Sequence, residues 1–166
     1  MEPIFGGIDD YIPLIEQTIL KLCDETDSDR IIILAHSMGG LVTRAYLRDH
    51  GNSHIARIIT VGTPHRGTML ANCAIGLNSR QMRRVGRFPR EKPSDWLITL
   101  AQSEKCTSSY TLFASIYSLH DNIIAPQLSC VLPSTKNISL NGIWHVELAT
   151  HPKCQALILD EIIQVS

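Results

Sequence analysis

The chain has 166 residues, 44% of them apolar and 19% charged, and its formal net charge is −1. These values are typical of a globular protein, and we expect residues 1–166 to form one domain. The near-neutral charge gives no general attraction to nucleic acid, and no apolar run reaches the roughly 20 residues that span a bilayer. The five cysteines are scattered without a Cys-x-x-Cys pair, so the sequence predicts neither a metal site nor a cofactor.

The segment before residue 30 is predicted to form one helix and no strand. Apolar side chains recur at helical spacing from Ile8 to Cys23, which predicts a helix from about Asp10 to Asp24. Pro13 is compatible with this helix because the N–H groups of a first turn lack partners within the helix. The first seven residues lack the basic and apolar regions of a signal peptide, but an upstream start could have carried one, so localisation stays open.

A strand, a tight turn and a helix follow in immediate succession. Residues 30–35 predict a fully buried strand, and residues 38–50 predict a helix that ends at Gly51. Between them lies a small-x-Ser-x-Gly turn, Ala35-His36-Ser37-Met38-Gly39. This is the layout of a nucleophile elbow, in which a serine hydroxyl projects from a strained turn. The pattern also arises by chance, but the flanking strand and helix favour the elbow.

If the elbow forms, the residues beside Ser37 have catalytic or packing roles. The helix points its positive end at the reaction centre, so the Met38 N–H is the candidate donor to a developing oxyanion. Small side chains at Ala35 and Gly39 would let the strand and the helix approach closely. His36 is expected to pack behind the elbow.

The next elements repeat the alternation of strand and helix. Residues 55–61 predict a second strand, which continues into the loop Thr63-Pro64-His65-Arg66-Gly67, and a short helix is expected near residues 68–77. Strands that alternate with helices at this spacing indicate a mostly parallel sheet flanked by helices, which is an α/β fold.

The segment 78–95 has no clear period and is rich in positive charge. It holds six of the fifteen basic residues, and we interpret it either as a solvated irregular connection or as a lid over the active site. Its charge would also suit peripheral contact with an anionic membrane surface, through residues 80–92. The basic residues are Arg80, Arg83, Arg84, Arg87, Arg90 and Lys92.

The rest of the chain predicts two more strands and two more helices. Thr150 is a candidate cap of the last helix. The expected ranges are 96–102 for a helix, 110–117 and 137–140 for strands, and 152–165 for the closing helix.

Two of these segments resemble one protein family. The run His36-Ser37-Met38-Gly39-Gly40 is similar to the elbow of the lipase and esterase branch of the α/β-hydrolase superfamily. The loop 61–68 is similar to the loop after the sixth strand in triacylglycerol-lipase-like enzymes. The similarity runs from about Ile8 to the C-terminus, and it implies the C-terminal part of an α/β-hydrolase fold.

The resemblance implies a catalytic triad in the chain order serine, acid, histidine. Asp121 follows the strand 110–117 by a few residues, and residues 121–126 resemble the family's Asp-x-Ile/Val-x-x-Pro pattern. Carboxylates at the carboxyl ends of parallel strands gather at such sites. The alternative is a loop aspartate that only stabilises a turn.

Two histidines follow Asp121 in the sequence. His145 comes directly after the last strand and its turn and matches the family's Gly-x-x-His ending, whereas His151 is better interpreted as a helix cap or a surface residue. We therefore expect His145 to accept the proton of Ser37 and Asp121 to orient His145.

The resemblance also implies strands at the N-terminal side that this sequence does not supply. In the family, several strands precede the elbow strand, and the loop after the third supplies the second oxyanion donor. Only about 30 residues precede that strand here, so the strand would lie at an open, apolar sheet edge. We interpret the chain as a fragment of a longer hydrolase, with a non-catalytic truncation and a chain completed by a partner as alternatives.

The favoured function is hydrolysis of a carboxylic ester, with an acyl ester or a lipid as the substrate, through an acyl-enzyme on Ser37. An acyltransferase would use the same triad and differ only in whether an alcohol or water reaches the acyl-serine. The alternatives from other classes are a non-catalytic binding or regulatory module and a peptidase on the same fold.

Overall fold

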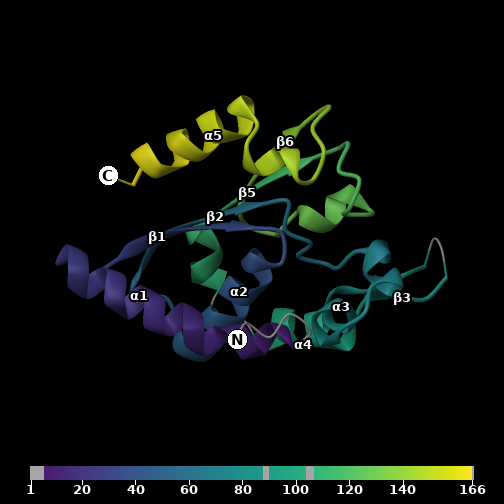
Figure 1. Ribbon diagram of the computed structural model, residues 1–166, viewed down its shortest axis with the longest axis horizontal. Helices are drawn as coiled ribbons and strands as arrows, with labels where there is room; N and C mark the ends of the chain where they lie inside the picture. Colours follow the sequence, from purple (N-terminus) through teal and green to yellow (C-terminus); the bar gives the residue numbers. More distant parts are fainter. Residues whose placement is uncertain (1–5, 88–89, 104–106, 166) are drawn as a thin grey trace.

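The computed structural model describes residues 6–87, 90–103 and 107–165. Its main sheet has four parallel strands in the order β1-β2-β5-β6, which is also their order along the chain (Figure 1). The carboxyl ends of all four strands therefore meet at one edge of the sheet, and the predicted α/β fold is confirmed. The strands are β1 Ile31–His36, β2 Ile55–Val61, β5 Phe113–Ser118 and β6 Lys136–Leu140.

Helices cover both faces of this sheet. Figure 1 shows α5 on one face, while α1, α2 and α4 lie on the other. These helices on the two faces are α1 Ile12–Thr26, α2 Gly39–His50, α4 Asp95–Ser103 and α5 Pro152–Ile163. Short 3-10 turns connect the elements: η1 Ile8–Tyr11, η2 Met69–Cys73, η3 Thr107–Leu112, η4 Gln127–Cys130 and η5 Glu147–Ala149.

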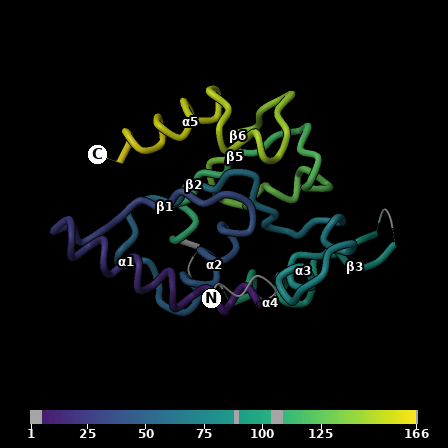
Figure 2. Tube along the Cα trace, in the orientation of Figure 1, coloured from purple at the N-terminus to yellow at the C-terminus, as the bar shows by residue number. Residues whose placement is uncertain are grey.

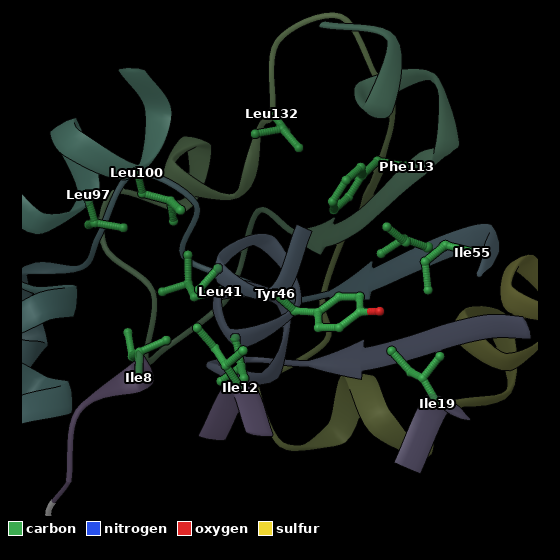
Figure 3. Close-up of a cluster of buried hydrophobic side chains, with 13 residues drawn as sticks. Ile8, Ile12, Ile19, Leu41, Tyr46, Ile55, Leu97, Leu100, Phe113 and Leu132 are labelled. Carbon is green, nitrogen blue, oxygen red and sulfur yellow. The ribbon is translucent and has the colours of Figure 1, made fainter. Parts of the chain in front are cut away.

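The alternation of side chains along β2 divides the core into two clusters. Ile58 packs with α1, α2 and α4, whereas Ile59 and Val61 pack with α5. This follows from strand geometry, because successive side chains point to opposite faces of a sheet. Figure 3 shows the first cluster, in which Ile12, Leu41 and Leu100 come from three different helices.

The N-terminal segment forms the predicted helix with a different start. A 3-10 turn, η1, precedes α1, and Pro13 lies at the first turn of α1. The helix ends where Asp27 takes a left-handed conformation with a φ of 51°. Residues 6–30 contribute η1 and α1 and no strand.

The prediction that the strand 30–35 is fully buried is wrong. β1 lies at the edge of the sheet with β2 on one side, and among its residues Ala35 alone is buried, while Leu34 is 54% exposed. The apolar sequence of β1 reflects contacts with the helical layers on its two faces, but its outer side lacks a neighbouring strand among the described residues. The expected open sheet edge is therefore present.

The basic segment is more ordered than an irregular connection. It contains the short helix α3 (Leu77–Met82) and an antiparallel hairpin of β3 (Arg84–Val85) and β4 (Lys92–Pro93). Figure 2 shows β3 at the margin of the molecule, far from α5. Residues 88 and 89 of the predicted segment lie outside the described residues. The absence of a clear period arises because each of these elements is too short to establish one.

Two predicted details near the last strands are also wrong. The strand expected from Tyr110 begins only at Phe113, because residues 107–112 form a 3-10 turn instead. The cap of α5 is His151, whose side chain accepts a hydrogen bond from the Lys153 N–H at 3.2 Å, and not Thr150.

A buried ion-pair network joins α5 to the sheet. The Glu161 side chain is 1% exposed and contacts both Arg57 of β2 and Lys136 of β6. Burial opposes its ionisation, but hydrogen bonds from Lys136 and Arg57 hold the pKa of Glu161 below the ordinary value of 4.5. The charged form of Glu161 therefore stabilises the folded state above that pH.

Replacing Glu161 by glutamine should lower the free energy of unfolding by about 1–3 kcal/mol at pH 7, because Arg57 then loses its buried counter-ion. A folded-state pKa below the unfolded one means that this difference shrinks as the pH falls below 4.5. Urea unfolding at pH 7 and pH 4 measures it. Glu25→Gln, in an exposed pair with Lys21, is the control and should change stability by no more than about 0.5 kcal/mol. Equal effects of the two substitutions would contradict the network.

Candidate active site

Ser37 occupies a strained turn between β1 and α2. Its φ of 54° lies in the left-handed region, which a residue with a side chain rarely adopts. Hydrogen bonds to β2 and to the loop after it hold the turn: the Ser37 N–H donates to the Val61 carbonyl at 2.9 Å, and the Ser37 carbonyl accepts from the Thr63 hydroxyl at 2.8 Å. The predicted order of strand, turn and helix is present, and the turn lies at the carboxyl edge of the sheet.

The closest approach in this turn is at Gly40. A Cβ atom at Gly40 would lie 2.3 Å from the Thr63 hydroxyl oxygen, whereas one at Gly39 would make an ordinary 3.7 Å contact with Ala35. Any side chain at position 40 would displace the hydroxyl that holds the Ser37 carbonyl. The sequence pattern points to Gly39, but the tighter constraint is on Gly40.

A chain of hydrogen bonds connects the three residues that the sequence predicts as a triad. His145 Nε2 lies 2.9 Å from the Ser37 hydroxyl oxygen, and His145 Nδ1 lies 2.8 Å from Asp121 Oδ2. The three residues come from different places in the chain, since they follow β1, β5 and β6. The parallel sheet brings them together because its strands end at the same edge.

Asp121 is held as a buried, ionised carboxylate. It is 3% exposed, and its Oδ1 accepts hydrogen bonds from the Ile123 and Ile124 N–H groups at 2.8 and 2.7 Å. Burial opposes ionisation and is the largest single influence, but the hydrogen bonds from His145 and these two amides hold the pKa of Asp121 below its usual value. A charged Asp121 would stabilise a protonated His145.

The backbone around His145 fixes the position of its ring. The His145 N–H donates to Asn122 Oδ1 at 3.1 Å, so the residue after the acid also holds the histidine. Gly62, with a φ of 56°, lies close to the ring, because a Cβ atom there would come within 3.2 Å of two His145 ring atoms. Gly62 therefore allows the ring to lie against the loop that follows β2.

His36 contributes to the site in a way that the sequence did not indicate. It does not pack behind the turn: the residue is exposed, its Nε2 lies 3.1 Å from the His145 carbonyl, and the two rings are 4.8 Å apart. Adjacency to Ser37 was the available signal, because a strand end that positions the serine also directs its neighbour to the same edge.

The Met38 N–H lies where α2 begins. Among the hydrogen bonds of the described residues, Met38 contributes its carbonyl to Leu41 and Val42, whereas its N–H makes none. This amide is thus free to donate to a ligand, as an oxyanion site requires. The structure identifies no second donor among residues 6–30, which form η1, α1 and the loop before β1.

Two other kinds of site have no counterpart in the described residues. Within residues 6–87, 90–103 and 107–165, no group of three or more His, Cys, Asp or Glu side chains could hold a metal ion. In the same ranges, no helix has both the length and the apolar character needed to cross a membrane.

The fold is that of the α/β-hydrolases. The structure superposes on the mature lipase BlEst2 of Bacillus licheniformis with a TM-score of 0.74 and 12% identity, over 93% of this chain and 74% of that one. A carboxylesterase structure from Nitrososphaera gargenis superposes with a TM-score of 0.56 and 14% identity, over 99% of this chain and 75% of that one. Phospholipase PlaB of Legionella pneumophila superposes with a TM-score of 0.53 and 15% identity, over 69% of this chain and 29% of that one.

The family follows from a separate comparison. Residues 9–150 match the family described as the PGAP1-like alpha/beta domain, which is most of the chain. The chain therefore belongs to the PGAP1-like alpha/beta domain family. The match includes Ser37, Asp121 and His145.

Proposed function

We propose that the chain is a serine hydrolase that cleaves carboxylic esters of acyl or lipid substrates. The observation that carries the proposal is the hydrogen-bonded chain from Ser37 through His145 to Asp121, at 2.9 and 2.8 Å. The fold shared with a lipase, a carboxylesterase and a phospholipase supports an ester as the substrate class.

The proposed reaction begins with attack of the Ser37 hydroxyl oxygen on the ester carbonyl carbon. His145 Nε2 accepts the hydroxyl proton, and the charge of Asp121 stabilises the resulting imidazolium. The Met38 N–H donates to the oxyanion of the tetrahedral intermediate. The carbon–oxygen bond to the alcohol then breaks, the alcohol leaves with the proton from His145, and Ser37 is acylated.

Deacylation repeats these steps with water. His145 takes a proton from the water as its oxygen attacks the acyl carbon, and the bond to Ser37 breaks with return of the proton to the serine oxygen. An alcohol in place of water would give a transferase, so access to the acyl-serine decides between hydrolysis and transfer.

Turnover of a chromogenic short-chain ester tests the proposal. The chain should release p-nitrophenol from p-nitrophenyl butyrate, and butyric acid should exceed any butyl ester formed when butanol is added. Release of the ester product in excess would show acyl transfer instead. A folded chain that turns over no ester at all would favour the non-catalytic binding module.

A further inference from the structure

A cavity separate from Ser37 lies between α3, the hairpin β3–β4 and the first turn of α4. Its volume is about 330 Å³, and three cationic side chains, Arg80, Arg83 and Lys92, line it. None of the three has an ion-pair or hydrogen-bond partner for its side chain among the described residues. Unpaired cations that line one concavity are a typical anion site.

The six basic residues of the segment fall into three groups. Arg84 has a structural role, because its guanidinium donates to the carbonyls of Arg66 and Glu91 at 3.0 and 2.7 Å. Arg87 and Arg90 are exposed, as Arg80 and Lys92 are, but they do not line the cavity. Half of these cations therefore line one open hollow on the surface.

The walls of the cavity are tied to the body of the domain. The Ser94 N–H donates to the Arg83 carbonyl at 3.0 Å, and the Thr68 N–H donates to the Met82 carbonyl at 2.8 Å. Trp96, which forms another wall, donates its indole N–H to Asp9 Oδ2 at 2.8 Å. These bonds hold the backbone of α3, the hairpin and α4 in place, so the walls of the cavity are formed before a ligand binds.

The charge of the lining selects the ligand. Asp95 also lines the cavity, so three cations and one carboxylate give it a net charge of +2. A phosphate monoester carries about −1.5 to −2 charges near neutral pH. Its three oxygens also suit recognition by more than one arginine fork. We propose that this cavity binds a phosphate monoester group, carried either by a soluble molecule or by a lipid headgroup.

Matched double substitutions test the site. Arg80→Gln with Arg83→Gln removes two lining cations, and Arg87→Gln with Arg90→Gln removes the same charge from the same segment outside the cavity. Both are made in the wild-type chain and in Ser37→Ala, so that the result does not depend on the proposed esterase activity. Circular dichroism and thermal unfolding verify that each variant folds.

Two probes distinguish the sources of the phosphate. Calorimetric titration with glycerol 3-phosphate measures soluble binding, and co-sedimentation with phosphatidylcholine vesicles that contain phosphatidic acid measures lipid binding. The cavity variant, Arg80→Gln with Arg83→Gln, should raise the Kd for at least one probe by about tenfold or more. The control variant, Arg87→Gln with Arg90→Gln, should keep the Kd within about twofold of the wild-type value. Ionic strength is held constant because screening alone changes such affinities.

The outcomes separate clearly. A cavity-dependent loss with glycerol 3-phosphate assigns the site to the soluble monoester, and a loss with vesicles alone assigns it to the lipid headgroup. The proposal would be overturned if the two double variants weakened probe binding equally, if the cavity variant bound both probes as the wild-type chain does, or if neither probe bound at all.

Discussion

The Ser37→Ala chain should lose ester hydrolysis by a factor on the order of 10³–10⁶ in kcat/KM. The reason is that the serine oxygen forms the acyl bond, and the structure places that oxygen 2.9 Å from the base that would accept its proton. Rates of p-nitrophenyl butyrate hydrolysis measure the loss. The hydrogen bonds that hold the turn use main-chain atoms of residue 37, which alanine also has, so thermal unfolding should change little.

Ser134→Ala is the matched control for this variant. Ser134 also has a left-handed φ, 60°, but it is exposed and lies in the loop before β6. Its replacement removes a hydroxyl from the same backbone conformation far from the proposed chemistry, and it should leave the rate unchanged. Comparable rates for Ser37→Ala and the wild-type chain would contradict the role of Ser37.

Asp121→Asn should lower kcat by roughly 10³–10⁴-fold. The Oδ1 atom must still accept the Ile123 and Ile124 N–H groups, so the asparagine NH₂ would face His145 Nδ1. That donor favours the histidine tautomer with its proton on Nε2, which cannot accept the proton of Ser37. The loss should therefore appear in kcat at every pH at which the chain is folded.

Asp160→Asn is the control for this substitution, because Asp160 is an exposed carboxylate on α5. Asp160→Asn should keep kcat within about twofold of the wild-type value, as expected for a substitution on the surface. Pre-steady-state kinetics would show whether acylation is the slowed step. An Asp121→Asn chain with kcat close to that of the wild type would mean that Asp121 only stabilises its turn.

The sequence allowed much of the fold to be predicted, because the signals were local. The second strand matches residues 55–61 without error, since a short β-branched run between polar residues has few alternatives. The proximity of Ser37, Asp121 and His145 was also predictable, because parallel strands place the residues after their carboxyl ends at one edge.

What could not be predicted depends on packing between distant segments. The contact of Gly40 with Thr63 and the tilted contact of the His36 and His145 rings join residues that are far apart in the chain. The exposure of Leu34 could not be read from its own apolar neighbourhood, because the position of a strand within a sheet is set by the other strands. The cavity beside Arg83 arises in the same way, from three short elements folded together.

Covalent labelling with a fluorophosphonate tests the central claim most directly, because it needs an activated serine and no particular substrate. Intact mass and peptide mapping should find one adduct, on Ser37, in the wild-type chain and none in Ser37→Ala. Circular dichroism on the same samples establishes that both chains are folded. A folded wild-type chain that stays unlabelled, or one that carries its adduct on another residue, would contradict the assignment of Ser37 as the nucleophile.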